Sequence, residues 1–217
     1  IIVAAIFVLL SQLTVMSLAG YVYPNVYGSA AAQSTASLLG TVVMLVVCAP
    51  FASKLSAKFG KKELAMGSSI ISALVWLVCL IWRPASVWGF VACYILANIG
   101  MGFFNTIIWA MITDVIDDAE VRNGVREDGT IYSVYSFARK LGQAFSSGLV
   151  GALLGIIGYT EATAFDPAVT RGIFNMACIA PIIGFVAIVL ALAFLYPLGK
   201  KKVEENVAIL AERTQNN

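Results

Sequence analysis

Apolar residues along this chain gather in six long runs separated by short polar breaks. A helix needs about 20 apolar residues to cross the roughly 30 Å of hydrocarbon in a bilayer, and each run is close to that length. The breaks contain proline, glycine and charged residues, which end helices. The pattern predicts an all-α membrane protein whose six-helix transmembrane bundle occupies residues 1–196, with spans at 1–22, 33–52, 64–82, 87–112, 131–158 and 172–196, before a cytoplasmic tail at 197–217.

Composition supports this interpretation and removes several function classes. Hydrophobic residues make up 60% of the chain and charged residues only 12%, whereas soluble domains carry about 25% charged residues. The net charge of +2 gives no reason to expect a nucleic-acid partner. The chain has no histidine, and its four cysteines lie inside apolar runs without the spacing of metal ligands. We therefore expect no enzyme activity, no cofactor and no metal site in this chain.

The basic residues predict how the chain is oriented. Twelve of the fourteen lie on one side of the predicted spans and only Arg83 and Arg171 on the other, and positive charge favours the cytoplasmic side. The sequence thus predicts a multi-pass protein of the plasma membrane with both ends in the cytoplasm. Aromatic residues near the outer surface, Tyr21, Tyr23 and Tyr27, are expected to form an interfacial belt.

Both ends of the sequence have recognisable features. The chain begins in an apolar run without methionine or a basic leader, which predicts that it is a fragment of a longer protein. The tail after Pro197 opens with a basic cluster and continues as a short amphipathic helix. It is expected to be a solvated anchor, or alternatively a surface for anionic lipid.

The run at 131–158 carries a polar stripe. Residues three and four positions apart share one face of a helix, and this spacing relates Ser133, Ser136, Lys140, Gln143 and Ser147. Neighbours in a helix are separated by about 100°, so Arg139 falls away from the stripe, next to Tyr132 and Tyr135. Lys140 is therefore a candidate cavity residue, and Arg139 a candidate gate residue or interface anchor. Further along, Gly151 and Gly155 predict close packing against another helix.

Three other runs have similar polar positions. Asn98, Asn105 and Trp109 recur along the fourth run, Ser34, Ser37 and Thr41 recur more weakly along the second, and Gln12 lies near the middle of the first. Such groups must face protein or water inside a membrane, so together they favour a water-filled cavity for a neutral, hydroxyl-rich solute such as a sugar. The alternatives are hydrogen bonds between helices without a ligand and, for Trp109, an aromatic anchor at the interface.

Acidic residues lie outside the centres of the predicted spans. The nearest group is Asp114, Asp117, Asp118 and Glu120, at the end of the fourth run. An intramembrane enzyme acting on diphosphates through Mg²⁺ would need a second acidic cluster, which the sequence lacks. Ion pairs that clamp a cytoplasmic gate are the favoured interpretation, with arginines Arg122, Arg126 and Arg139 as candidate partners.

One segment resembles a known family. The run DVIDDAEVRNGVREDGTIYSVYSFARKLGQAFSSGLVGALLGIIGY is similar to the characteristic segment of the glycoside-pentoside-hexuronide:cation symporters, the melibiose-permease-like branch of the major facilitator superfamily. In that family this segment joins transmembrane helices 10 and 11 of twelve. The resemblance implies that the six spans correspond to helices 7–12, the C-terminal half.

The resemblance also implies a function and residue roles. The expected activity is symport of a sugar or glycoside with Na⁺ or H⁺ by alternating access, with the coupling cation held mainly by carboxylates of the missing N-terminal half. Lys140 matches a lysine near the sugar and cation sites. Four residues match a charged cluster tied to conformational switching at the cytoplasmic gate: Asp114, Asp117, Glu120 and Arg126.

The expected partners are the sugar substrate, the lipid bilayer and the missing six-helix half. Polar stripes left open in half of a transporter also favour self-association of this chain. Two alternatives remain open at this point. One is an uncoupled carrier of sugar or lipid with the same fold, and the other is a membrane sensor or binding module that signals without transport.

Overall fold

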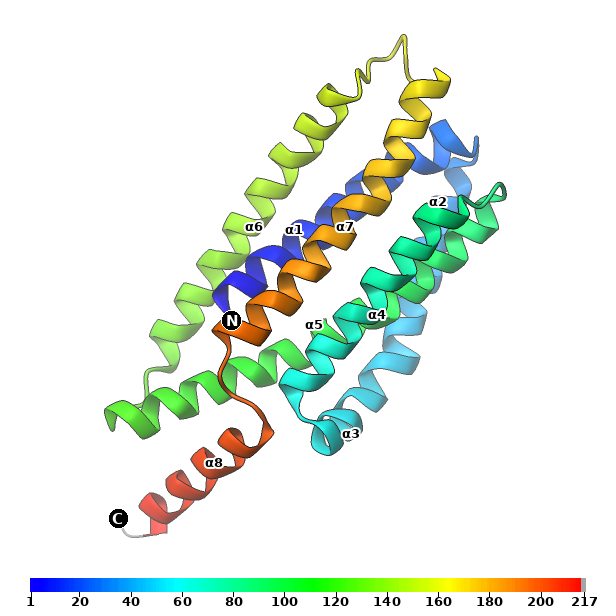
Figure 1. The fold of residues 1–217 in the computed structure, drawn as a ribbon. Helices are drawn as coiled ribbons and strands as arrows, with labels where there is room; N and C mark the ends of the chain where they lie inside the picture. Colours follow the sequence, from blue (N-terminus) through cyan, green and yellow to red (C-terminus); the bar gives the residue numbers. More distant parts are fainter. Residues whose placement is uncertain (216–217) are drawn as a thin grey trace.

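The computed structural model describes residues 1–215 and is all-helical (Figure 1). The final two residues of the predicted tail lie outside the described part. Two π-helical segments, η1 and η2, continue the α-helices that precede them. In chain order the elements are α1 (Ile2–Tyr21), η1 (Val22–Val26), α2 (Ala30–Val43), η2 (Met44–Cys48), α3 (Ala49–Phe59), α4 (Lys61–Trp82), α5 (Val87–Asn123), α6 (Asp128–Ile156), α7 (Pro167–Leu195) and α8 (Lys200–Gln215).

Five helical segments within residues 1–215 are long and apolar enough to cross a membrane. They contain nearly all of the first four predicted spans and of the last one, with bounds Ile2–Val26, Ala30–Phe59, Lys61–Trp82, Val87–Asn123 and Pro167–Leu195. The fifth predicted span, 131–158, also forms a long helix, α6, but α6 is not among these five. Its serines, glycines, Arg139 and Lys140 make it less apolar than the others. The structure thus supports an all-helical membrane protein without establishing the predicted sixth span.

Helix α5 is longer than its predicted span of 87–112. It continues to Asn123, for 37 residues in all, and ends where Gly124 takes a positive φ of 74° and donates its N–H to the Glu120 carbonyl. An ion pair between Asp118 and Arg122, one turn apart, lies on this extension. Such a helix is about 55 Å long and exceeds the hydrocarbon thickness of about 30 Å. The segment after residue 112, which the sequence predicts to be a connection between spans, is therefore mostly helical.

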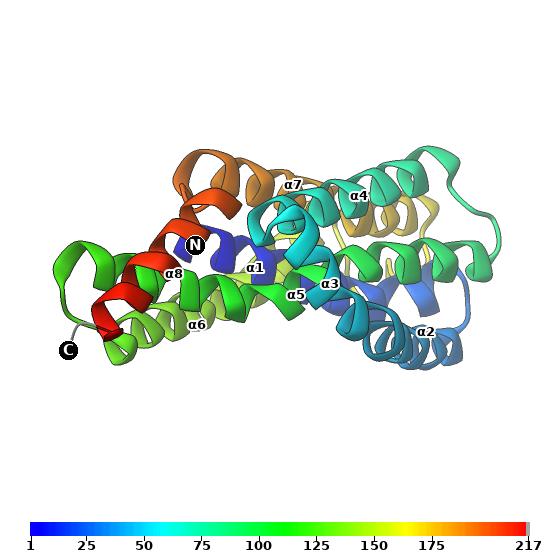
Figure 2. The ribbon, with the colours of Figure 1, turned by 90° about the horizontal axis from the view of Figure 1, so that it is seen from below.

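The bundle has two packed layers that share α7. Helix α4 packs against α5 and α7, and α1 packs against α6 and α7. Helix α2 adds a lighter contact to α5, and α6 touches the bundle mainly through α1. Figure 1 shows α6 along one edge of the molecule and α2 with α3 along the other, and Figure 2 shows α4 and α7 on the side opposite to α2 and α6. Among residues 1–215, one long side of α6 is consequently left without a neighbouring helix.

The two ends of the bundle differ in what they carry. The end with Ile1, Gly60, Gly124 and α8 is called the tail end below, and the end with Gly28, Arg83 and Gly158 is called the far end (Figure 1). Connections at the far end join α1 to α2, α4 to α5, and α6 to α7. This arrangement places the two ends of the described chain on the same side of the bundle.

Aromatic side chains fill the core toward the far end. Phe90 lies at their centre, with its ring centroid 5.5 Å from that of Tyr23 and 6.0 Å from that of Trp76. Tyr23 is only 1% exposed, so the expected place of Tyr23 in an interfacial belt is wrong. The reason is its edge-on packing against Phe90 inside the bundle, which outweighs the preference of a tyrosine hydroxyl for water.

Helices approach each other most closely where a glycine has no side chain. A Cβ added to Gly100 of α5 would lie 2.3 Å from the Ser68 carbonyl oxygen of α4, and Ser72 donates its hydroxyl to Ala97 O at 2.8 Å across the same contact. By contrast, a Cβ on Gly151 or Gly155 would meet nothing within 4 Å. The described part of the chain thus provides no partner for the predicted Gly151–Gly155 packing surface.

Replacing Gly100 with alanine is expected to destabilise the protein. The added methyl group would push α5 away from α4, and overpacking of this kind costs about 1–3 kcal/mol. Thermal unfolding of the full-length protein in detergent measures the effect. Gly148→Ala is the matched control, because Gly148 is also inside a helix but has open space around it, and alanine there favours the helix by about 1 kcal/mol. Equal melting temperatures for the two variants would contradict the close contact.

Candidate functional site

A polar pocket lies between α1, α2 and α5. Two adjoining cavities of about 180 and 60 Å³ form it, and both are lined by Gln12 of α1 and by Tyr94 and Asn98 of α5. The larger one also contains Asn105. We call these cavities the amide pocket. Complete small-molecule sites are about 300–1,000 Å³, so the amide pocket has the size expected of part of a binding site.

The amide pocket has groups that can bind hydroxyls. Asn105 donates an N–H to Gln12 Oε1 at 3.4 Å, which joins α5 to α1, and Asn98 donates to Tyr94 O at 2.8 Å in its own helix. A side-chain amide has two N–H donors and an acceptor oxygen, so these bonds leave capacity for a solute. Ser37 and Thr41 of α2 also line the larger cavity. The structure therefore brings together three of the predicted pathway residues, Gln12, Asn98 and Asn105.

The polar stripe of α6 lies elsewhere. All five of its residues, from Ser133 to Ser147, are exposed, whereas the opposite side of α6 buries Tyr135, Ala138, Gly142 and Ser146. No α6 residue lines the amide pocket in the described chain. Within this chain, Lys140, Gln143 and the stripe serines face away from the packed bundle instead of joining the other pathway candidates.

Trp109 and Arg139 contact each other. The guanidinium carbon of Arg139 lies 5.4 Å from the Trp109 ring centroid and 5.8 Å from that of Tyr135. The two rings also meet edge-on at 5.4 Å. Cation–π contacts of this kind stabilise by about 0.5–2 kcal/mol. Arg139 is thus held between α5 and α6 by aromatic rings, and it makes no ion pair with a carboxylate in residues 1–215.

The predicted gate cluster is organised by Arg126. Its guanidinium pairs with Asp117, Glu120 and Asp128, each at 2.9 Å. Hydrogen bonds that Arg126 donates to Asp117 and then to Glu120 hold the pKa of Arg126 above its usual value. These contacts tie the end of α5 to the start of α6 across the turn at Gly124. Arg139 is not part of this cluster.

Asp114 forms a separate pair with Lys61. The carboxylate is 4% exposed, and the Lys61 ammonium at the start of α4 donates to it and to Ala110 O. This contact links α4 to α5 at the tail end. The sequence does not predict this pair, because nothing in the spacing of either run gives the register between two helices.

The tail crosses the tail end of the bundle as α8. Asn206 donates to the Asp118 carboxylate at 2.9 Å, and Arg213 donates to the carbonyls of Glu120 and Val121 at 3.2 and 3.1 Å. At its other end α8 is fixed by Lys200, which donates to Ala57 O of α3. The expected short helix forms, and it packs on protein along one side.

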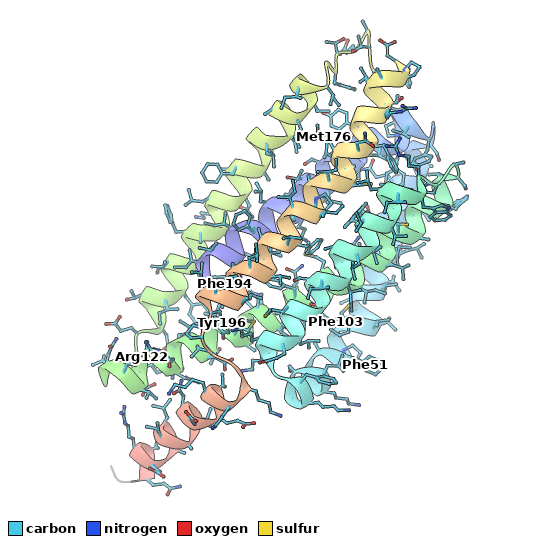
Figure 3. All side chains as sticks on the ribbon, in the orientation of Figure 1. Phe51, Phe103, Arg122, Met176, Phe194 and Tyr196 are labelled. Carbon is cyan, nitrogen blue, oxygen red and sulfur yellow. The ribbon has the colours of Figure 1, made fainter. Side chains whose placement is uncertain are left out.

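The segment before α8 is also attached. Tyr196, labelled in Figure 3 at the end of α7, donates its hydroxyl to Met111 O of α5, and its own carbonyl accepts from Lys62. Figure 3 shows Arg122 further along the α5 extension, toward the turn into α6. Together these contacts join α3, α4, α5 and the tail into one network at the tail end.

Comparison with known proteins identifies relatives of this chain. A family model described as MFS/sugar transport protein matches residues 1–200. The chain is 31% identical over 179 residues to a glucuronide carrier protein homolog of Escherichia coli (strain K12), covering 81% of this chain and 38% of that protein. It is 33% identical over 177 residues to an uncharacterized symporter of Bacillus subtilis (strain 168), covering 82% of this chain and 38% of the symporter.

A third relative adds a different substrate name. The chain is 29% identical over 175 residues to a Salmonella typhimurium protein provisionally named a sulfoquinovose importer, covering 81% of this chain and 36% of that protein. In all three cases the chain spans less than two fifths of the relative's length.

Removing Lys61 is expected to leave a buried charge without its partner. Lys61→Ala should therefore lower the free energy of unfolding by about 3 kcal/mol. The double variant Lys61→Ala/Asp114→Asn should recover most of that loss, because a neutral amide is much cheaper to bury than a carboxylate. Denaturation of the full-length protein in detergent provides the measurement, with the exposed Lys54→Ala as control. If the double variant is as unstable as Lys61→Ala, the loss of stability does not come from the unpaired charge of Asp114.

Proposed function

Because this chain belongs to the MFS/sugar transport protein family, among relatives that include symporters, we propose that it is the C-terminal half of a sugar:cation symporter. Its helices would correspond to helices 7–12 of a twelve-helix protein in the plasma membrane. The amide pocket carries this proposal, since Gln12 and Asn105 come from two different helices and together present amides to one cavity. Sugar hydroxyls both donate and accept hydrogen bonds, as these amides do.

The exposed stripe of α6 supports the same proposal. Polar side chains at membrane depth must contact protein or water, and the described chain leaves this stripe open. In the proposed transporter, α6 is the sixth span and its stripe faces the missing half across a water-filled pathway. On the same helix, Phe137 and Phe145 are exposed at angles different from the stripe and would contact lipid. Lys140 then lies where an acid or a bound cation of the other half could reach it.

The tail end would be the cytoplasmic gate. Its basic residues favour the cytoplasm by the positive-inside bias, and its charged groups could form and break contacts with the other half when the two halves rock. Arg126 is the central group because it binds three carboxylates at once. Alternating access would break contacts between this network and the other half while the bonds inside α5, α6 and α8 persist.

The names of the relatives narrow the substrate class. Glucuronides and sulfoquinovose are both hydroxyl-rich molecules that carry an acidic group. We propose a substrate of this type, with the amide pocket binding its hydroxyls.

Proteoliposomes that contain the full-length protein test the function. Uptake of a radiolabelled glucuronide should rise several-fold when an inward Na⁺ or H⁺ gradient is imposed. An uptake rate that is the same with and without either gradient would indicate an uncoupled carrier. The absence of any flux would contradict the transport proposal.

Lys140→Ala is expected to impair coupled uptake more than Arg139→Ala. Lys140 is exposed on the stripe, whereas Arg139 is held by Trp109 and Tyr135. Loss of the Lys140 charge should reduce gradient-driven uptake at least about tenfold while affecting gradient-independent exchange less, since a tenfold change corresponds to 1.4 kcal/mol. Both rates are measured in the same proteoliposomes. Near wild-type uptake in both variants would remove Lys140 from the coupling mechanism.

Asn105→Ala is expected to weaken substrate binding without unfolding the protein. Each neutral hydrogen bond contributes about 0.5–1.5 kcal/mol, so the substrate concentration for half-maximal uptake should rise up to about tenfold. The control is Asn123→Ala, which removes an exposed amide at the end of the same helix. If Asn105→Ala leaves this concentration unchanged, the amide pocket does not contact the substrate.

A further inference from the structure

A second cavity, of about 350 Å³, lies at the far end of the bundle. It is formed by η1, the connection between α4 and α5, and the first turns of α7. It shares no lining residue with the amide pocket, and it is the larger of the two. The residues that matter for its chemistry are Tyr27, Arg83, Thr170, Arg171 and Phe174.

Both arginines of the far end line this one cavity. The remaining twelve lysines and arginines belong to segments nearer the tail end, so the only two cations that oppose the positive-inside bias are placed together. Neither Arg83 nor Arg171 makes an ion pair with a carboxylate in residues 1–215, and no acidic residue lines the cavity. The acids of this end, Glu161 and Asp166, lie outside the lining and are exposed.

Arg83 is held in place by several contacts. It has a left-handed backbone with φ of 48°, which is unusual for a residue other than glycine, and its N–H donates to Cys79 O at 3.0 Å at the end of α4. Its guanidinium donates to Asn175 Oδ1 of α7 at 3.2 Å, and the next residue, Pro84, accepts the Tyr27 hydroxyl at 2.9 Å. Strained residues at fixed positions are typical of functional sites.

The guanidinium groups retain most of their donors. A guanidinium has five N–H donors in a planar fork that matches two oxygens of a carboxylate, sulfonate or phosphate. Arg83 uses one of these donors for Asn175. Arg171 lies in the first turns of α7, near the partial positive charge that the backbone N–H groups give to a helix N-terminus. The rings of Tyr27 and Phe174 form apolar walls of the cavity.

We propose that the far-end cavity binds an oxyanion through Arg83 and Arg171, as a site separate from the amide pocket. An oxyanion there would contact two exposed cations that line the same cavity. The oxyanion is either a soluble ion or the phosphate of an anionic lipid, since both present the same oxygens to the arginines. The proposal concerns binding and does not depend on whether the protein transports sugar.

Inorganic phosphate and phosphatidylglycerol are the probes. The full-length protein is placed in nanodiscs of neutral phosphatidylcholine, and phosphate binding is titrated by calorimetry at constant ionic strength. In a second arm, nanodiscs contain phosphatidylglycerol, and lipid retained by the released protein is counted by native mass spectrometry. Charge-assisted hydrogen bonds contribute enough that Arg83→Gln/Arg171→Gln should weaken the bound probe at least about tenfold.

The controls separate charge from folding. Lys201→Gln removes one charge from the exposed surface of α8 and should leave both probes unaffected. Arg171→Gln alone keeps the Arg83–Asn175 contact, so it should fold normally and still weaken binding. Loss of phosphate binding in the arginine variants identifies a soluble oxyanion, and selective loss of phosphatidylglycerol identifies a lipid. If neither probe binds the wild-type protein, or if both bind the arginine variants equally well, the proposal is wrong.

Discussion

The close contact between α4 and α5 at Gly100 determines where most of the polar chemistry lies. Gly100 allows the α5 backbone to approach Ser68 of α4, and Ser72 fixes the same register with a hydrogen bond to Ala97. Since α5 is one continuous helix, this register also positions Asn98 and Asn105 on either side of the contact. The same register places Asp114 of α5 next to Lys61, the first residue of α4, at the tail end. One tight helix pair therefore positions both the amide pocket and the Lys61–Asp114 pair.

The sequence predicts what depends on local spacing. Apolar run length is enough to place nearly all of the long helices, and intervals of three and four residues are enough to put Ser133, Lys140 and Ser147 on one side of α6. The same helical spacing predicts that Arg139 and Lys140 lie on different faces of α6, because neighbouring residues differ by about 100° around a helix. The family resemblance is likewise visible in one segment with a distinctive charge pattern, and the family model matches residues 1–200.

Contacts between helices could not be predicted in the same way. Whether Arg139 meets a carboxylate or an aromatic ring depends on the rotation of α6 against α5, and the ring of Trp109 was also compatible with a membrane interface. The end of α5 was missed because a charged segment rich in helix-forming residues resembles a loop when only hydropathy is considered. The burial of Tyr23 was missed since its neighbour Phe90 is distant in sequence.

The attachment of α8 has a consequence for how the protein is made. A chain leaves the ribosome from its N-terminus, so α5 is synthesised well before the residues that bind its end. Until Asn206 and Arg213 emerge, Asp118 has only its local ion pair with Arg122, and the carbonyls of Glu120 and Val121 lack the guanidinium that later binds them. Docking of α8 is then a late step of biogenesis, which follows membrane insertion of α7 and closes a surface that every earlier translation intermediate leaves open.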